Sequence, residues 1–136
     1  MYRILYISTA RAPLSDTQMD EILATSRRHN RSVDVTGCLV VGGRRFLQAL
    51  EGPREAVEQT FARISEDPRH FAIVKLNDKA IKHRSFARWA MGFERGGDTF
   101  AEASLAEQVA ALLAPVTDPN LRAYFIGFAT SHGKAA

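Results

Sequence analysis

The sequence predicts an α+β fold of the ferredoxin-like type, a mixed sheet with two helices on one face and two C-terminal helices on the other. Segments with strand-like and helix-like apolar periodicity follow one another in the order β-α-β-β-α-β-β. Both alternating sets of strand residues are largely apolar, so both faces of the sheet need a cover. Two further helix-like segments follow the last strand and can supply the second cover.

Turn and cap residues set the expected bounds of each element. Ser15 is an N-cap candidate, Pro53 suits the first turn of a helix, and Gly42-Gly43 suits a tight hairpin turn. The predicted strands are residues 2–8, 33–41, 45–50, 71–76 and 89–93. The predicted helices run from Ser15 to about His29, from Pro53 to Asp67, from Phe100 to Leu113 and from Asp118 to about Phe128.

The composition is typical of one globular domain in a reducing compartment. The chain has 136 residues, of which 46% are hydrophobic and 24% charged, and its net charge is +3. Cys38 is the single cysteine, so no internal disulfide can form. No signal peptide and no membrane-length apolar stretch are present, and the basic residues are scattered. We therefore expect a cytoplasmic protein with no membrane partner, and nucleic acid is an unlikely partner.

Three polar side chains fall at positions where a packed core favours apolar residues. Tyr6 lies on the first strand, Asn30 at the end of the first helix, and Gln48 in the middle of the third strand. Buried polar groups need hydrogen-bond partners. Spacing alone leaves two alternatives, because Tyr6 and Gln48 can bond to each other or the backbone, or they can serve a ligand.

At these residues the sequence resembles the BLUF family, the blue-light sensors that use flavin. The resemblance covers residues 1–94. Each motif alone is weak evidence, but the motifs together, in this order and at this spacing, are specific for the family. The matching motifs are Leu5-Tyr6-Ile7-Ser8, His29-Asn30, Val35-Thr36-Gly37-Cys38-Leu39, Phe46-Leu47-Gln48-Ala49-Leu50-Glu51-Gly52, Asp67-Pro68-Arg69-His70 and Arg84 to Phe93.

The resemblance implies a flavin between the first two helices, with FAD as the expected cofactor and FMN as the alternative, and no metal. The photoactive residues would be Tyr6 and Gln48. Asn30 would meet the amide-like edge of the ring, which needs one donor and one acceptor. The full set of implied cofactor-binding residues is Tyr6, Ile22, Ser26, His29, Asn30, Gln48, Phe61, Ile64, Asp67, Arg69, His70, Trp89 and Met91.

Two of these residues compete for one place. Alternation along the predicted fifth strand puts Trp89, Met91 and Phe93 on one face. In the family, a tryptophan and a methionine on this strand are alternatives for the position beside the glutamine. The sequence does not say which of Trp89 and Met91 points inward.

The mechanism implied by the resemblance is a switch rather than substrate turnover. Light-driven electron and proton transfer between Tyr6, Gln48 and the flavin would leave Gln48 rotated or tautomerised, with a small red shift. The signal would reach a partner protein in trans, and a homo-oligomer is expected. Residues 1–94 would form the flavin-binding core, and residues 95–136 a helical cap of the same domain.

Three alternative interpretations fit the sequence less well. Arg45-Phe46-Leu47-Gln48 is similar to a motif of the LOV photoreceptors, but Arg44 stands where their reactive cysteine would be. Cys38 is expected to be a small packed residue. An acylphosphatase-like hydrolase would need a glycine-rich anion loop, and Thr9 to Pro13 contains no glycine. A flavin-binding or protein-binding module without photochemistry would not need Tyr6 and Gln48.

Overall fold

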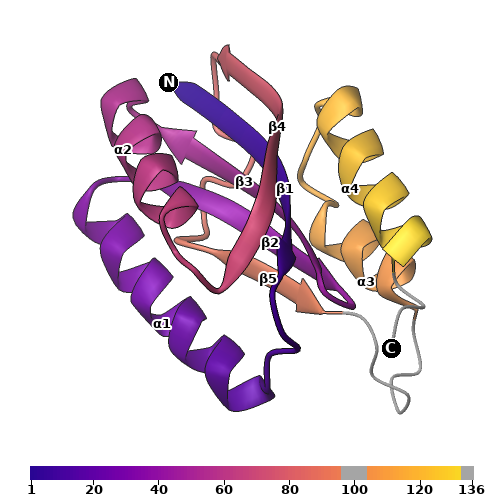
Figure 1. The fold of residues 1–136 in the computed structure, drawn as a ribbon. Helices are drawn as coiled ribbons and strands as arrows, with labels where there is room; N and C mark the ends of the chain where they lie inside the picture. Colours follow the sequence, from indigo (N-terminus) through magenta and orange to yellow (C-terminus); the bar gives the residue numbers. More distant parts are fainter. Residues whose placement is uncertain (96–103, 133–136) are drawn as a thin grey trace.

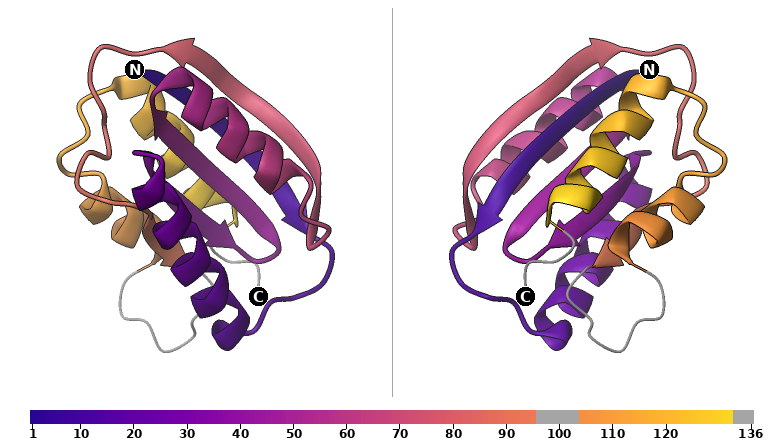
Figure 2. Two further views of the ribbon diagram at one scale, coloured as in Figure 1. Left: turned by 90° about the vertical axis from the view of Figure 1, so that its left-hand side faces the viewer. Right: turned by 90° about the vertical axis from the view of Figure 1, so that its right-hand side faces the viewer.

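The computed structural model describes residues 1–95 and 104–132 and consists of one sheet between two layers of helices (Figures 1 and 2). The strands are β1 (Tyr2–Ala10), β2 (Thr36–Gly42), β3 (Arg45–Gly52), β4 (His70–Ala80) and β5 (Gly92–Arg95). The helices are α1 (Asp16–Ser32), α2 (Arg54–Ser65), α3 (Leu105–Leu112) and α4 (Pro119–His132). None of the helices in the described ranges is long and apolar enough to cross a membrane.

The strand order in the sheet is β4-β1-β3-β2-β5. The pairs β4–β1, β1–β3 and β3–β2 are antiparallel, and β5 lies parallel to β2. Figure 2 shows α1 and α2 over one face and α3 and α4 over the other. The predicted α+β arrangement is therefore confirmed, including the second helical cover.

The two apolar faces predicted from alternation form two separate cores. The core under α1 and α2 contains Ile4, Tyr6, Leu39 and Leu50, together with Met91. The core under α3 and α4 is built from the alternate strand residues and from the apolar faces of the two C-terminal helices. Its buried members include Leu5, Cys38, Val40, Leu47, Ala49, Phe86, Val109, Leu121 and Phe125.

Local signals in the sequence account for the helix and hairpin that frame the site. Ser15 and Gln18 form a capping box at the start of α1, each side chain bonding the other residue's backbone N–H. Gly43 has a φ of 59° at the β2–β3 turn, a conformation that glycine adopts without steric cost. The resulting register places Gln48 directly opposite Tyr6 on one side and Leu39 on the other.

Several element bounds differ from the prediction. α1 continues to Ser32, and β2 begins at Thr36 rather than Val33, because Val33 caps α1 and Asp34 takes a φ of 61°. β4 continues to Ala80 rather than ending at Leu76, since it pairs with the whole of β1. The expected start of the third helix at Phe100 lies outside the described residues.

The largest correction concerns the fifth strand, which starts at Gly92 and not at Trp89. Trp89 and Met91 precede the strand, so the two-residue alternation does not apply to them. Trp89 packs against Phe86 beside the α3/α4 core, with the ring centroids 6.0 Å apart. Met91 is buried in the α1/α2 core. The predicted common face for Trp89 and Met91 was therefore wrong.

Candidate functional site

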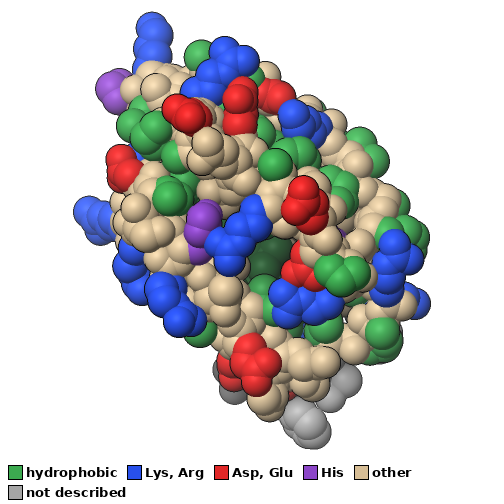
Figure 3. All heavy atoms as spheres, turned by 60° about the vertical axis from the view of Figure 1, so that its left-hand side comes forward, with side chains coloured by type: hydrophobic (Ala, Val, Ile, Leu, Met, Phe, Trp, Pro, Cys, Tyr) green, Lys and Arg blue, Asp and Glu red, His purple; other side chains and the backbone are tan. Residues whose placement is uncertain are grey.

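A hollow of about 290 Å³ opens between α1, α2 and the sheet. In Figure 3 it has a hydrophobic floor, and basic, acidic and histidine side chains surround its mouth. Both helices and the central strands contribute to the lining. The lining residues are Tyr6, Ser8, Leu14, Met19, Glu21, Ile22, Thr25, Ser26, His29, Asn30, Leu39, Phe46, Gln48, Thr60, Arg63, Ile64, Asp67, Arg69 and His70.

A chain of three buried side chains lies at the base of the hollow. The Tyr6 hydroxyl donates a hydrogen bond to Gln48 Oε1, and Gln48 Nε2 donates to Met91 Sδ at 3.4 Å. Among the described residues, none accepts the second N–H of the Gln48 amide. Gln48 also lines the hollow. The amide therefore retains a donor for a bound ligand.

The surroundings of Tyr6 keep its phenol neutral. Burial raises the pKa of the Tyr6 hydroxyl, and the negative charge of Asp67 raises it further. The Phe61 ring meets the Tyr6 ring edge-on with centroids 5.2 Å apart. Tyr6 is thus a fixed phenolic donor at ordinary pH.

Two side chains of α1 hold the backbone just before β5. Asn30 Nδ2 donates to the Ala90 carbonyl at 2.7 Å. Arg27 donates to the Met91 carbonyl through Nε at 3.0 Å and through Nη2 at 2.9 Å. The position of Met91 beside Gln48 is therefore set partly by α1.

The mouth of the hollow is polar and carries charge on both sides. On one side, His29 bonds Thr60 Oγ1 at 3.2 Å and also contacts Arg63. Burial lowers the pKa of the His29 imidazole, and the Arg63 charge lowers it further. On the other side, the hydrogen bond from Arg69 holds the pKa of the Asp67 carboxyl below its usual range.

His70 closes one end of the hollow. Its Nδ1 lies 2.8 Å from Ser8 Oγ, and its Nε2 lies 2.7 Å from the Ile64 carbonyl oxygen. These contacts connect β1, α2 and the start of β4. The imidazole is therefore fixed in place rather than free in solvent.

The structure brings most of the residues proposed from the sequence to this one hollow. The ones that line it are Tyr6, Ile22, Ser26, His29, Asn30, Gln48, Ile64, Asp67, Arg69 and His70. Phe61 lies behind Tyr6, and Met91 touches Gln48 without lining the hollow. Trp89 lies on the α3/α4 side of the sheet.

Sequence reasoning missed Thr60 and Arg63 as members of the site. Both line the hollow, and together with Ile64 they follow the i, i+3, i+4 spacing of one face of α2. Leu39 was also missed, although it faces Gln48 across the hairpin. These spacings were available in the sequence as signals.

Cys38 lies on the opposite face of the sheet and is fully buried. Burial raises the pKa of its thiol, and the charges of Glu94 and Glu51 raise it further. A thiol rather than a thiolate is present at neutral pH, so the residue is not poised as a nucleophile.

Comparisons with known proteins place this site in a described family. The family model "Sensors of blue-light using FAD" (BLUF) matches residues 1–92. The photoactivated adenylate cyclase subunit beta of Euglena longa is 34% identical over 89 residues, which are 65% of this chain and 10% of that protein. The blue light- and temperature-regulated antirepressor BluF of Escherichia coli is 35% identical over 88 residues, or 65% of this chain and 22% of that protein.

Solved structures extend the likeness to almost the whole chain. The photo-activated state of BlsA matches with a TM-score of 0.69 and 25% identity, covering 93% of this chain and 91% of that one. The dark-state structure of BlrB, described as a BLUF protein, matches with a TM-score of 0.67 and 28% identity over 96% and 89%. The chain spans only 10% and 22% of the two curated relatives named above. The family match over residues 1–92 nevertheless covers well over half of the chain, which therefore belongs to the BLUF family of flavin-binding blue-light sensors.

Proposed function

We propose that the hollow between α1 and α2 holds oxidised FAD, and that Tyr6 and Gln48 convert absorbed blue light into a change of hydrogen bonding. The observation that carries this proposal is the Tyr6–Gln48–Met91 chain at the base of the hollow. Every member of that chain is buried. A rearrangement of one amide would therefore be transmitted to its neighbours rather than absorbed by solvent.

The lining fits a flat, partly polar ring system. Ile22 of α1 and Ile64 of α2 supply apolar contacts from opposite helices. The side-chain oxygen of Asn30 (Oδ1) supplies an acceptor for an amide-like edge, and the second N–H of the Gln48 amide supplies a donor. A cofactor with this combination of apolar faces and amide edge matches the donors and acceptors present.

The mouth supports FAD in preference to a cofactor without phosphates. Arg63 and Arg69 both line the hollow and are exposed, Arg69 in an ion pair with Asp67. Guanidinium groups bind phosphate oxygens in a fork geometry. His29, held by Thr60, would lie between the ring and such a phosphate chain. FMN, with one phosphate, would use fewer of these groups.

The residues of the chain can supply an electron and move a proton. A bound flavin contributes the absorption of blue light and an excited ring able to accept an electron. Tyr6, as a neutral buried phenol, can give up an electron and pass its proton along its hydrogen bond to Gln48. When electron and proton return, the Gln48 carboxamide can be left with its donor and acceptor ends exchanged.

Reversal of this amide would change two contacts of the chain's own residues. An amide whose oxygen faces Met91 no longer donates to Met91 Sδ, and the NH₂ group that then faces Tyr6 cannot accept the hydrogen bond that Gln48 Oε1 accepts before the reversal. Met91 is attached to α1 through Arg27 and leads directly into β5. The switch therefore acts on the edge of the sheet that faces the C-terminal helices, without turning over a substrate.

Residues 1–94 are proposed to form the flavin-binding core, and residues 95–136 to form a cap that belongs to the same domain. Support comes from α4, whose Phe125 meets Phe86 of the β4–β5 loop with centroids 5.7 Å apart. We further propose a cytoplasmic homo-oligomer that signals to a separate partner protein. The surface that α3 and α4 present is the natural route to that partner.

An absorption spectrum before and after blue light tests the proposed function. The purified chain should be yellow, should shift slightly to the red on illumination, and should recover in the dark. A colourless protein that does not take up added FAD would contradict the cofactor assignment. Bleaching of the main flavin band instead of a shift would contradict the mechanism.

A further inference from the structure

A second hollow, of about 330 Å³, lies on the side of α1 that faces the segment before β5. α1 contributes Arg27 and Arg31, and the other residues come from the Arg88–Phe93 segment and from Leu112 of α3. It does not share a lining residue with the hollow proposed for the flavin. It is therefore a separate site.

The charge of this second hollow is uncompensated. Three arginines line it and no carboxylate does. Arg27 uses two of its N–H groups on the Met91 carbonyl. Within residues 1–95 and 104–132, Arg31 and Arg88 have no hydrogen-bond or ion-pair partner, and both are exposed. Several guanidinium groups that line one hollow without a counter-charge favour a bound anion.

We propose that this hollow binds a small phosphate-bearing anion with at least two negative charges. Arg31 and Arg88 would each bind oxygens of one phosphate group, and the remaining N–H groups of Arg27 would bind the same ligand. The concave shape, with Trp89 and Leu112 as its apolar wall, suits a compact anion better than an extended acidic chain. Elsewhere along α1, Arg28 does not line the hollow.

The position of this site gives it a route to the switch. An anion held by Arg27 would fix the guanidinium that supports the Met91 carbonyl, and Met91 Sδ accepts from Gln48. Any ligand that binds one state of Met91 more tightly must shift the balance between the states. This coupling rests on the proposed photochemistry, whereas the binding site does not.

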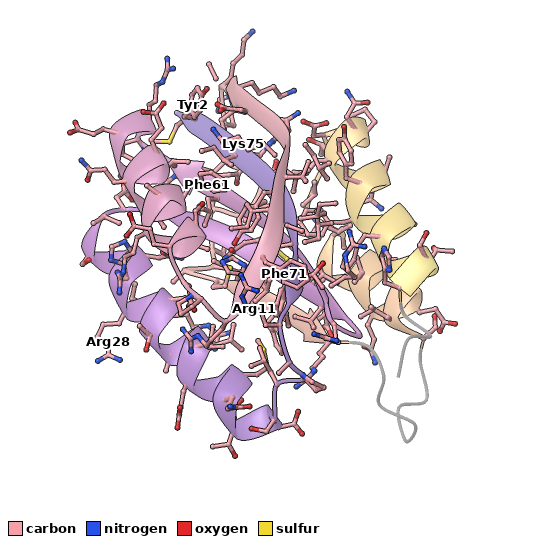
Figure 4. The ribbon with its side chains drawn as sticks, in the orientation of Figure 1. Tyr2, Arg11, Arg28, Phe61, Phe71 and Lys75 are labelled. Carbon is pink, nitrogen blue, oxygen red and sulfur yellow. The ribbon has the colours of Figure 1, made fainter. Side chains whose placement is uncertain are left out.

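Calorimetric titration of the 136-residue chain in the dark with inorganic pyrophosphate, in a buffer free of phosphate and sulfate, tests the binding site. Arg31→Gln and Arg88→Gln should each weaken binding about tenfold, since each removes a charge-assisted hydrogen bond. Arg28→Gln is the matched control. Arg28 is exposed, lies on the same helix, and points away from the protein in Figure 4. Its replacement should change the affinity less than about twofold.

Three outcomes would overturn the site. Equal weakening by all three variants would show general attraction to a basic surface. Absence of measurable pyrophosphate binding would remove the ligand class. Tighter binding of a polyglutamate peptide than of pyrophosphate, with the same dependence on Arg31 and Arg88, would make the surface a docking site for an acidic protein.

The dark-recovery rate tests the coupling separately. Pyrophosphate at about three times its Kd for the unmodified chain should change the rate of return from the red-shifted state at least about twofold in that chain and much less in Arg31→Gln and Arg88→Gln, which a tenfold weaker affinity leaves mostly unoccupied. An unchanged rate despite calorimetric binding would refute the coupling and leave the site standing. Absence of a light response in the unmodified chain would instead refute the proposed photochemistry. The binding result would still hold, because the calorimetric titration needs no light.

Discussion

The two faces of the sheet are formed by the same strands but serve different purposes. On the α1/α2 face, Tyr6 and Gln48 stand opposite one another and border an open hollow. One residue later on β1 and one residue earlier on β3, Ile7 and Leu47 are also paired, and Ile7 packs against the α3/α4 core to which Leu47 belongs. Alternation along a strand thus separates a polar, ligand-accessible layer from an apolar anchoring layer by a single residue.

The two faces also differ in the burial of their charged side chains. At the hollow, charged groups stay at the mouth and are partly exposed. Beneath α4, the fully buried Glu51 carboxylate lies 3.5 Å from Arg3 and accepts the backbone N–H groups of Ser85 and Phe86. Arg3 also reaches Asp118, the residue before α4, at 3.0 Å. Burial raises the pKa of the Glu51 carboxyl, while the Phe86 amide and Arg3 favour its charged form.

This buried network joins β1, β3, the β4–β5 loop and the start of α4. It connects the strand of Gln48 to the C-terminal helices on the face that the ligand does not reach. The hollow should therefore govern the light response, and the network should govern stability. Variants in the hollow and in the buried network should therefore have separable effects.

Removal of either photoactive side chain should have the largest effect. Tyr6→Phe deletes the phenolic donor with little change in volume, and Gln48→Leu deletes the amide at similar size. Each variant should retain flavin and lose the red-shifted state completely. Difference spectra before and after blue light provide the measurement. A normal red shift in Tyr6→Phe would contradict the role assigned to the α1/α2 face.

Arg3→Met should cause the largest loss of stability. It leaves the buried Glu51 carboxylate without its cation, a change that costs about 3 kcal/mol in the free energy of unfolding. Urea unfolding measures the cost, and Arg54→Met is the control, because its ion pair with Glu58 is exposed to solvent and should contribute little to stability. The red shift of folded Arg3→Met should be unchanged. Loss of that shift would show that the two faces are not separable.

Asn30→Ala should weaken flavin binding without abolishing the switch. The variant removes the bond to the Ala90 carbonyl and the acceptor offered to the ligand. A loss of roughly 1–2 kcal/mol, about tenfold in affinity, is expected. Titration of the apoprotein with FAD measures the affinity. Asn120→Ala is the control, because Asn120 is an exposed residue in the first turn of α4. An unchanged affinity would remove Asn30 from the proposed site.

The sequence was sufficient to predict features that depend on local periodicity. The N-cap at Ser15, the hairpin turn at Gly42-Gly43 and the division of strand residues between two faces all follow from spacing of a few residues. The placement of Tyr6 and Gln48 as polar residues in a packed core also follows from the sequence, whereas their direct pairing depends on the β1–β3 register and was only one of two alternatives. These elements form the base of the candidate site.

Features that depend on distant contacts were not predicted. The path of residues 89–91 is fixed by Asn30 and Arg27, side chains about 60 positions earlier in the chain. Those bonds send Met91 and Trp89 to opposite sides of the sheet, where alternation had placed them together. The burial of Glu51 likewise depends on Arg3, which lies 48 positions away.

Cys38→Ala should have a modest effect that is confined to stability. The side chain packs in the α3/α4 core, and the loss of one buried sulfur atom should cost about 1 kcal/mol. Cys38→Ser should cost more, because its hydroxyl would be buried without a partner. Both variants should show a normal light response. Loss of that response in Cys38→Ala would support thiol chemistry instead of the Tyr6–Gln48 switch.

Acidification should release α4 slightly, through Asp118. Although burial alone would raise the pKa of this carboxyl, hydrogen bonds from the Leu121 amide and from Arg3 outweigh it, and the pKa in the folded state is lowered. A lowered carboxyl pKa contributes stability above its unfolded value, near pH 4, and that contribution is lost as the pH falls through the folded value.

Asp118→Asn should therefore be less stable than the unmodified chain at neutral pH, by less than about 1 kcal/mol because the carboxylate is 28% exposed. The difference should begin to shrink below about pH 4 and should vanish only below the lowered pKa of Asp118 in the folded state, where both forms carry a neutral side chain. Urea unfolding across this range measures it, with the light response as an internal control. Equal stability of the two forms at every pH would mean that the Asp118 carboxylate does not anchor α4 and that its apolar contacts do.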